Sequence, residues 1–131
     1  MKIQLLDHVN MQTTELEMME KWYSDILGLE KGYRPPFEEI GSWLYAAGHA
    51  MVHLVEVQNP PDRTDRPELE HFAMRATGLS SLLEKLTARN ITYYPVRVPE
   101  IRLLQINFND PEGNHLHIDF PAEEADALGF S

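Results

Sequence analysis

The stretch LDHVNM, residues 6–11, decides the fold of this chain because nearly the same stretch, LEHFAM, returns at residues 69–74. Laying residues 6–16 over residues 69–79 produces identities at Leu6, His8, Met11, Thr14 and Leu16, and Asp7 lies over Glu70. A second match at nearly the same spacing pairs MVHL (51–54) with HLHI (115–118). Two matches at nearly one spacing indicate an internal repeat whose unit is about half of the chain.

Each half of the chain is expected to contain the same order of elements. The first half reads as a strand at 6–11, a helix at 14–28, a strand near 29–34 and a hairpin with arms at 40–47 and 50–57. The second half reads as a strand at 69–74, a helix at 79–89, a strand at 91–98 and a hairpin at 101–120. Each half is therefore predicted to fold as a βαβββ module.

Both expected helices carry apolar side chains on one face. The first helix has a stripe at Leu16, Met19, Trp22, Tyr23 and Ile26, and the second has one at Leu79, Leu82, Leu83 and Leu86. Thr14 and Glu17 have the spacing of a capping box. A sheet with one helix covers one face with that helix, so we predict an α+β fold in which each module has one helix-packed face and one open face.

The module boundaries follow from the repeat and from the composition. Module one spans 3–57, a polar, proline-rich linker spans 58–68, and module two spans 69–121. The acidic stretch 122–131 is expected to be a solvated or loosely docked tail. A chain of 131 residues is long enough for one domain and too short for two independent ones, so residues 1–131 are taken as a single domain.

Composition argues against several classes of protein. The chain has no cysteine, which excludes disulfides and thiolate metal sites and agrees with the cytoplasm, where we expect this protein. A formal net charge of −10 argues against a nucleic-acid partner, which needs a basic patch. No window approaches the ~18 apolar residues of a membrane span, and charges come too early for a signal peptide.

The closing hairpin of the second half separates polar from apolar side chains. If Asn107 faces His117, one face carries Leu104, Ile106, Phe108, Leu116, Ile118 and Phe120, which would pack on the helix. The other face then carries Gln105, Asn107, His115, His117 and Asp119. A slip by one residue would mix the faces, so the pattern fixes the register. The same offset in the first half sets Trp43 and Tyr45 beside Met51, His53 and Val55.

Four histidines occupy equivalent places in the two halves: His8 and His53 in the first, His71 and His117 in the second. If the halves pair about a pseudo-twofold axis, the four imidazoles converge and can hold one divalent metal per site, such as Zn, Ni, Co, Mn or Fe(II). A single histidine on a strand is more often a structural or surface residue. Two separate matches that select the same positions favour the metal hypothesis.

Six further residues on the open faces are candidates for substrate contact: Asn10, Trp43, Tyr45, Gln105, Asn107 and His115. The three amides would orient a substrate, or would form ordinary cross-strand hydrogen bonds. The two aromatic rings would wall the site, or would pack in the core. His115 would contact the substrate or a metal ligand, or would be a solvated residue at the edge of the loop.

Two motifs resemble the vicinal oxygen chelate superfamily. LDHVNM followed by WYSDILGLE (22–30) is similar to the family's opening strand and helix, and NDPEGNHLHIDF (109–120) is similar to its closing hairpin. The resemblance covers residues 3–121. The superfamily includes glyoxalase I, methylmalonyl-CoA epimerase, fosfomycin-resistance transferases, extradiol dioxygenases and bleomycin-binding proteins, and the two motifs do not choose among them.

The resemblance implies two βαβββ modules that form an open, curved sheet around a central metal, with the helices on the outer faces. It also implies that modules often pair between two chains, so a homodimer is expected. His8 and His71 match ligand positions of the family, and His53 matches a fourth-strand position that is a ligand in glyoxalase-like members and absent in some others. His117 stands where the family usually has glutamate. This departure weakens a glyoxalase-type reaction, because a metal-bound histidine cannot also serve as the general base.

We therefore predict a metal-dependent enzyme that chelates a small oxygenated substrate, of lyase, isomerase or dioxygenase type. Four neutral ligands would leave the full charge of a divalent ion on the metal, which strengthens polarisation of the substrate oxygens. Transferase chemistry also stays open, although the chain has no obvious insertion or basic patch for glutathione. The alternative is a metal-free binding or resistance protein of the same fold.

Overall fold

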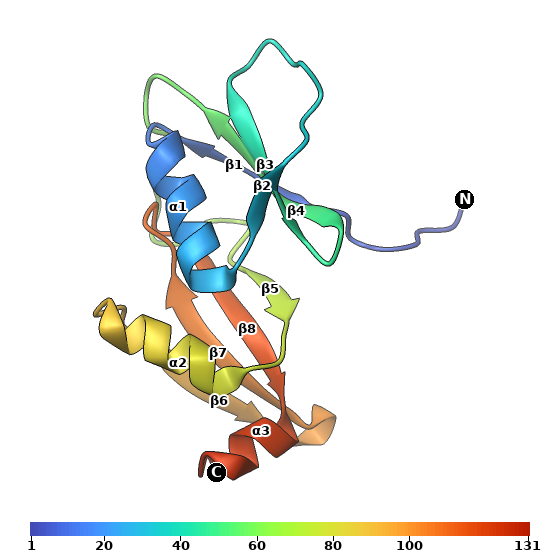
Figure 1. The fold of residues 1–131 in the computed structure, drawn as a ribbon, viewed down its shortest axis with the longest axis vertical. Coiled ribbons are helices and arrows are strands. Elements are labelled where there is room, and N and C mark those ends of the chain that lie inside the picture. Colours follow the sequence, from blue (N-terminus) through green and yellow to red (C-terminus); the bar gives the residue numbers. More distant parts are fainter. The chain divides into compact units, whose positions relative to one another are not determined.

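The computed structural model of the chain describes residues 1–131. The chain divides into two compact units, residues 1–64 and 65–131. Each unit contains one of the predicted modules, and Figure 1 colours them from blue to green and from green to red. The division between the units falls inside the stretch 58–68 that the sequence marks as a linker.

Module one contains β1 (Val9–Thr13), α1 (Leu16–Leu27), β2 (Glu30–Gly32), β3 (Gly41–Ala46) and β4 (His49–Glu56). Its strands form one sheet in the order β1-β4-β3-β2. The first and last strands are parallel neighbours, whereas β2, β3 and β4 pair antiparallel. The two-residue turn between β3 and β4 consists of Ala47 and Gly48, which both have positive φ. This geometry matches the right-handed twist of the strands.

Module two contains β5 (Phe72–Arg75), α2 (Leu79–Ala88), β6 (Tyr94–Val98), a 3₁₀ turn (Pro99–Ile101), β7 (Leu103–Asn109), β8 (His115–Pro121) and α3 (Ala122–Ala127). Its sheet has the order β5-β8-β7-β6, again with parallel first and last strands. The two modules therefore share one topology. The predicted α+β fold class and the βαβββ repeat are confirmed.

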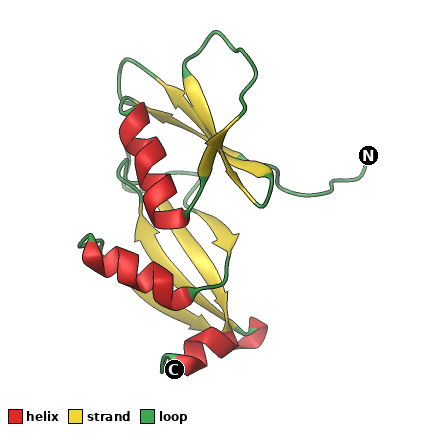
Figure 2. Ribbon diagram, viewed as in Figure 1, coloured by secondary structure: helices red, strands yellow, loops and turns green.

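Each sheet packs one face against the helix of its own module, and Figure 2 shows α1 and α2 lying along these faces. Helix α1 buries Leu16, Met19, Tyr23 and Ile26, and helix α2 buries Leu79, Leu82 and Leu86. The six apolar side chains that the hairpin pattern assigned to the helix side are all buried: Leu104, Ile106, Phe108, Leu116, Ile118 and Phe120. Burial of one such side chain stabilises a fold by roughly 1.5–3 kcal/mol.

Helix α1 begins differently from the capping box that the sequence predicts. The N-cap residue is Glu15 rather than Thr14, and no side chain caps the helix. Instead, the backbone N–H of Glu15 donates a hydrogen bond of 2.9 Å to the Thr13 hydroxyl oxygen. Thr13 is fully buried at the end of β1, so its hydroxyl serves the connection between strand and helix rather than the helix itself. The prediction of a capping box at Thr14 is wrong for this reason.

The acidic C-terminal stretch forms helix α3, whose Ala122 and Ala125 are buried. Its Glu124 carboxylate accepts hydrogen bonds from the backbone N–H groups of Gly78 and Leu79, at 2.8 and 2.7 Å. Gly78 is the N-cap of α2 and has no side chain that could satisfy these donors. The C-terminal helix therefore completes the first turn of α2, and its carboxylate lies where the helix dipole favours negative charge.

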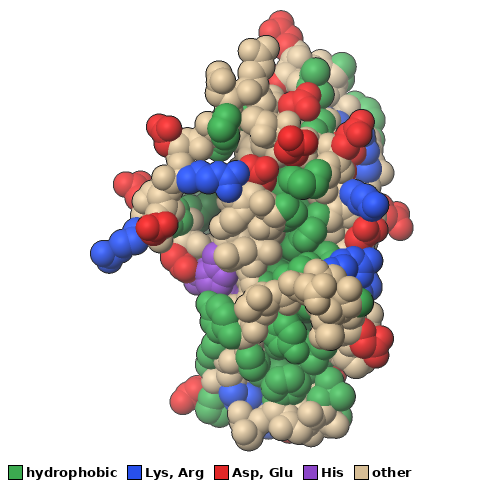
Figure 3. Space-filling view, turned by 90° about the vertical axis from the view of Figure 1, so that its left-hand side faces the viewer, with side chains coloured by type: hydrophobic (Ala, Val, Ile, Leu, Met, Phe, Trp, Pro, Cys, Tyr) green, Lys and Arg blue, Asp and Glu red, His purple; other side chains and the backbone are tan.

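The surface has an excess of acidic side chains, with 21 Asp and Glu against 11 Lys and Arg. On the face drawn in Figure 3, Lys and Arg side chains lie apart from one another rather than in a continuous patch. None of the helices combines the length and the apolar character that crossing a lipid bilayer requires.

Replacing Glu124 by alanine should lower the free energy of unfolding by about 1 kcal/mol, the usual effect of losing a helix cap. Glu124→Gln keeps one acceptor oxygen and should lose less. Urea unfolding followed by circular dichroism measures both variants. Equal stability of Glu124→Ala and the wild-type chain would contradict the capping role.

Candidate functional site

The closing hairpin of module two has the register that the sequence predicts. Asn107 pairs with His117, Gln105 with Asp119 and Asn109 with His115. Leu116, Ile118 and Phe120 alternate with these residues and face the buried side. The open face of the sheet therefore carries a row of polar side chains on two neighbouring strands.

The turn between β7 and β8 is built on the buried carboxylate of Asp110. Its Oδ1 accepts the backbone N–H groups of Glu112 and Asn114, both at 2.9 Å, and its Oδ2 accepts the side-chain amide of Asn114 at 2.9 Å. Gly113 has a φ of 86°, which glycine adopts without steric cost. The turn fixes the residue at which β8 begins, and so it sets the positions of His115 and His117 along the sheet.

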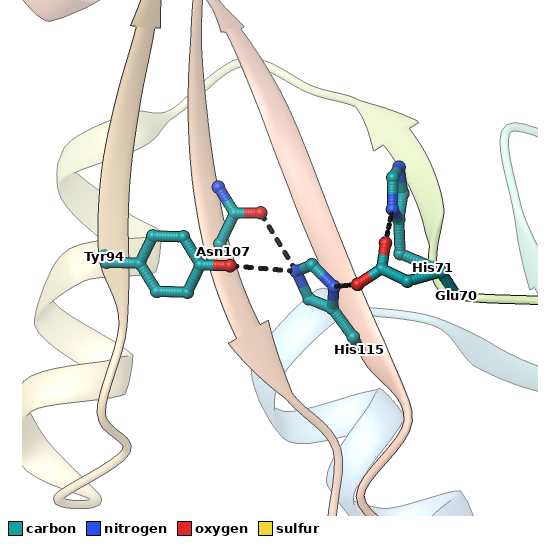
Figure 4. Close-up of polar contacts among 5 residues, drawn as sticks. All are labelled: Glu70, His71, Tyr94, Asn107 and His115. Carbon is teal, nitrogen blue, oxygen red and sulfur yellow. Dashed lines mark hydrogen bonds and ion pairs between the residues drawn. The ribbon is translucent and has the colours of Figure 1, made fainter. Parts of the chain in front are cut away.

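Three imidazoles gather on the open face of module two. The ring centre of His71 lies 5.2 Å from that of His115 and 4.8 Å from that of His117. Glu70 bridges two of these rings: one carboxylate oxygen accepts the Nδ1–H of His71, and the other accepts the Nδ1–H of His115 at 2.8 Å (Figure 4). The hydrogen bond from His71, followed by that from His115, holds the pKa of Glu70 below its ordinary value. Glu70 is thus a fixed negative charge between two imidazoles.

Glu70, His71 and His115 each offer one ligand atom, and these atoms all lie within 4.8 Å of one another. Such spacing is compatible with a shared cation after small adjustments, because carboxylate and imidazole are both ligands of first-row metals. In Figure 4 the second ring nitrogen of His71 points away from Glu70. His71 can therefore present a nitrogen on the side opposite to the carboxylate.

His117 is buried, with 6% of its surface exposed. Its Nδ1–H donates to Asp119 Oδ1 at 2.6 Å. Because an ionised carboxylate only accepts hydrogen bonds, this contact keeps the proton on Nδ1 and leaves the lone pair of Nε2 free. Asp119, which the sequence placed on this face beside the ligand candidates, orients His117 in this way.

His115 connects the cluster to Asn107 and Tyr94. Its Nε2 lies 3.0 Å from the amide oxygen of Asn107 and 3.4 Å from the hydroxyl oxygen of Tyr94 (Figure 4). Asn107 is 4% exposed, and its amide nitrogen has no hydrogen-bond partner in the protein. An unsatisfied buried donor costs about 1–3 kcal/mol. With the Nδ1 proton of His115 donated to Glu70, a neutral ring offers a lone pair at Nε2, so the Asn107 amide turned by 180° would donate this N–H to Nε2.

Module one arranges its two histidines differently. The His53 ring stacks on two others. Its centre lies 3.8 Å from that of His8, with 12° between the ring planes, and 4.1 Å from that of Trp43, with 13° between the ring planes. Burial lowers the pKa of His53, and the charge of His8 lowers it further. His53 Nε2 lies 3.2 Å from the carbonyl oxygen of Ala50. The lowered pKa favours the neutral ring, which is the form that binds metals.

His8 precedes β1, and its Nδ1–H donates to Asp7 Oδ2 at 2.6 Å. This hydrogen bond is the largest cause that lowers the pKa of Asp7. His49, the first residue of β4, approaches the same residue: its Nε2 lies 2.8 Å from the Asp7 carbonyl oxygen and 3.2 Å from Asp7 Oδ1. Asp7 therefore stands between two imidazoles, as Glu70 does in module two.

Module one has an open groove of about 910 Å³ beside its two histidines. Five of the candidate residues line it: His8, Asn10, Trp43, Tyr45 and His53. Arg34 and Phe37 also line the groove, with the guanidinium carbon 5.0 Å from the centre of the ring. The volume is in the range that binds small molecules. The aromatic residues thus lie at a groove surface rather than in the closed core.

The β3–β4 hairpin departs from the simple register at one point. A one-residue shift between Leu44 and Tyr45 pairs Tyr45 with Ala50, whereas the sequence analysis set it beside Met51. Trp43 remains opposite His53, as expected. A shift of this kind adds local twist and changes the direction of one side chain. The side chain at this position is Tyr45, whose hydroxyl donates to the Tyr33 carbonyl oxygen at 2.6 Å.

The parallel strand pairs bring the expected ligands together within each module. In module one, Asn10 is the register partner of His53, and in module two Ala73 is that of His117. His8 and His71 stand two residues before these partners. His8 therefore lies beside His53, and His71 lies beside His117. Convergence of all four imidazoles on one metal stays a prediction.

Sequence reasoning missed the roles of Asp7, Glu70 and His49. The repeat alignment already set Asp7 over Glu70, and a carboxylate directly before a candidate ligand in both copies was the available signal. His49 gave no such signal, because the repeat does not align it with another histidine.

The donor set fits a divalent first-row metal. His8, His71 and His117 each have Nδ1 engaged by a carboxylate, so their Nε2 atoms can be offered as ligands. Metal-bound histidines in proteins commonly have this carboxylate on the other ring nitrogen. The absence of cysteine and the lowered pKa of His53 agree with an imidazole-rich site.

Comparison with known proteins identifies relatives. The family profile described as "Glyoxalase/Bleomycin resistance protein/Dioxygenase superfamily" matches residues 5–118. A search of curated protein sequences finds no match to this chain. Among solved structures, a glyoxylase/bleomycin resistance protein/dioxygenase domain from Frankia sp. EAN1pec is similar, with a TM-score of 0.77, 20% identity, and coverage of 92% of this chain and 93% of that chain.

Two further similar structures have named activities. The fosfomycin resistance protein FosX from Listeria monocytogenes has a TM-score of 0.69 and 16% identity, with 94% of this chain and 98% of that chain covered. Lactoylglutathione lyase from Agrobacterium tumefaciens has a TM-score of 0.65 and 18% identity, with 90% of this chain and 94% of that chain covered. At these identities the likeness shows the fold alone.

Replacing Asp110 by alanine should lower the free energy of unfolding by about 2–3 kcal/mol, because three donors lose a charged acceptor. Asp110→Asn keeps one oxygen and should lose about 1 kcal/mol. Urea unfolding measures stability, and ring resonances of His115 and His117 in NMR spectra report the position of β8. Unchanged stability of Asp110→Ala would contradict the role given to this turn.

Proposed function

Because this chain belongs to the glyoxalase/bleomycin resistance protein/dioxygenase superfamily, we propose that it is a metal-dependent enzyme that chelates a small oxygenated substrate. The reaction would be of lyase, isomerase or dioxygenase type. One observation carries the proposal: His71, His115 and His117 gather with Glu70 on the open face of module two. Three clustered imidazoles with a carboxylate are suited to metal binding.

His8, His53, His71 and His117 are the proposed ligands of a Zn, Ni, Co, Mn or Fe(II) ion. Such an ion, when bound, would polarise neighbouring oxygens of the substrate. Because His117 stands where the family usually has glutamate, this ligand set is neutral. A neutral set is suited to an anionic, chelating substrate, since the full positive charge of the ion is available to it.

The side chains of this chain would bind and orient the substrate. The buried amide of Asn107 would contact the substrate and orient it. Gln105 and Asn10 would add polar contacts from the same open faces. Trp43 and Tyr45 would cover the apolar part of the substrate along the groove of module one and exclude water from it. His115 would hold Asn107 in place through its Nε2 contact.

The alternative function is a metal-free protein that binds or sequesters a small molecule. The stack of His8, His53 and Trp43 favours it, because parallel rings along an open groove resemble a platform for a planar ligand. The similar structures include a fosfomycin resistance protein and a lactoylglutathione lyase, so both a resistance function and an enzymatic function agree with this fold.

Metal analysis separates the two functions. We expect protein never exposed to chelator to contain about one tightly held divalent ion per site. His71→Ala and His117→Ala should each weaken Zn²⁺ binding by more than about 100-fold, since the loss of even a partner of a ligand costs 10–100-fold. Isothermal titration of the chelator-treated protein with Zn²⁺ measures the affinity.

His49→Gln removes an imidazole that contacts Asp7 but lies outside the proposed ligand set, so it should leave the metal stoichiometry unchanged and should lower the affinity less than the two ligand variants do. Absence of metal from the wild-type protein, together with unchanged thermal stability after chelator treatment, would support the metal-free alternative.

We also propose that the protein acts as a homodimer in the cytoplasm. Leu6 and Leu69 occupy equivalent positions of the repeat and are 83% and 75% exposed. Large apolar side chains exposed at equivalent places in both modules support an interface that covers them. Lack of cysteine agrees with the cytoplasm.

Light scattering after size-exclusion chromatography should give twice the chain mass of 15.1 kDa. Leu6→Glu and Leu69→Glu should weaken the dimer at least about tenfold, since each would bury a charge. Met18→Glu on α1 also changes an exposed apolar residue and should leave the dimer intact. A monomeric wild-type chain would contradict the homodimer.

A further inference from the structure

We propose that Asp7 and Glu70 are positioning residues that fix the ring orientation and the tautomer of His8 and His71. Each carboxylate holds the proton on Nδ1, and each ring therefore presents Nε2 to the metal. The inference rests on the proposed metal-dependent function and deepens it, because it assigns a role to two residues that are not themselves ligands.

The first support is that the same contact occurs in both modules. His8 Nδ1–H donates to Asp7 at 2.6 Å, and His71 Nδ1–H donates to Glu70. The repeat alignment superposes these two pairs. The carboxylates differ in length by one methylene group, yet both reach the same nitrogen of the following ring. Because the two modules are separate units, two independent parts of the chain arrive at one arrangement.

The second support is that another imidazole anchors each carboxylate to the sheet. His49, the first residue of β4, approaches Asp7 with Nε2 at 3.2 Å from Oδ1. His115, the first residue of β8, donates its Nδ1–H to Glu70 at 2.8 Å. In both modules, therefore, the closing strand begins with a histidine that holds the carboxylate of the opening segment.

This anchor matters because the opening histidines lie just outside the strands. β1 begins at Val9 and β5 begins at Phe72, so His8 and His71 precede the first ladder residue. Both side chains are exposed. Stacking on His53 restrains the His8 ring, but without a carboxylate partner either ring would exchange its proton between the two nitrogens. The carboxylate fixes the proton on Nδ1, because an ionised carboxylate accepts a hydrogen bond and cannot donate one.

The arrangement also increases the strength of the ligand. A histidine that donates one ring N–H to a carboxylate has a more basic second nitrogen. His117 follows the same rule, with Nδ1–H on Asp119 at 2.6 Å. His53 departs from it, since its Nε2 faces the Ala50 carbonyl oxygen. The inference is accordingly limited to the two opening histidines.

Glu70 could instead be a ligand itself, together with His71 and His115. Both of its oxygens are engaged by imidazole N–H groups, so a cation there would displace two hydrogen bonds. Asp7 makes the equivalent contacts in module one. The shared geometry therefore favours positioning over direct ligation.

The first test is NMR of metal-free protein labelled with ¹⁵N in the histidine rings, at about pH 8, above the ordinary histidine pKa of about 6.5. Wild-type protein should show His8 and His71 as Nδ1–H tautomers. In Asp7→Ala the His8 ring, and in Glu70→Ala the His71 ring, should change to mixed tautomers. Asp7→Asn and Glu70→Gln keep an acceptor oxygen and should restore part of the wild-type signal.

The second test is the affinity for Zn²⁺. Each alanine variant should bind 10–100-fold more weakly, as expected for loss of a partner of a metal ligand, and the amide variants should fall between alanine and wild type. Glu68→Ala is the matched control, because it removes one exposed negative charge from the linker close to Glu70 and should leave the affinity unchanged.

The outcomes distinguish the inference from the proposed function. If wild-type protein binds Zn²⁺ and the alanine variants keep its affinity, the inference is wrong and the metal-dependent function stands. Coordination of Zn²⁺ through His71 Nδ1, seen in the ¹⁵N shifts of the loaded protein, would likewise overturn the inference alone. If the wild-type protein binds no metal, both fall.

Discussion

The parallel pairing of the first and last strands in each module is the constraint on which the rest of the structure depends. In module one this pairing sets β1 against β4, and in module two it sets β5 against β8. A parallel pair needs a long crossover connection, which here is the helix with the remaining two strands. The pairing puts the opening and closing histidines of each module on one open face, while the helix covers the other face. Chemistry and core packing are thereby kept on opposite sides of the same sheet.

Much of this arrangement could be predicted from the sequence, because it depends on residue types that recur at regular intervals along the chain. The alternation in residues 104–108 and 116–120 fixes both the faces and the register of the β7–β8 hairpin, since a slip by one residue would bury polar side chains. The repeat of LDHVNM and LEHFAM fixes the topology of both modules in the same way. The positions of α1 and α2 follow from the apolar stripes, although α1 begins without the capping box expected at Thr14. The acidic stretch 122–131, expected to be a solvated or loosely docked tail, instead forms helix α3 with two buried alanines.

The rest of the site depends on individual side-chain contacts that follow no regular spacing in the sequence. Asp7, Glu70 and Asp119 each hold a neighbouring imidazole, but the sequence gives no rule for which nitrogen a nearby carboxylate engages. The stack of His8, His53 and Trp43 and the shift at Tyr45 result from side-chain packing within one groove. Glu124 contacts α2 from more than forty residues away in the chain, and such a distant cap leaves no local pattern.

The two hairpin turns have unequal tolerance of added length. The β7–β8 turn depends on the buried carboxylate of Asp110, so an inserted residue there would break several hydrogen bonds at once. Ala47 and Gly48, in contrast, are exposed, and Gly48 stands on the rim of the groove in module one. Residues inserted into the β3–β4 turn can therefore lengthen this edge of the groove and change its entrance for larger ligands, while the sheet of module one keeps its structure.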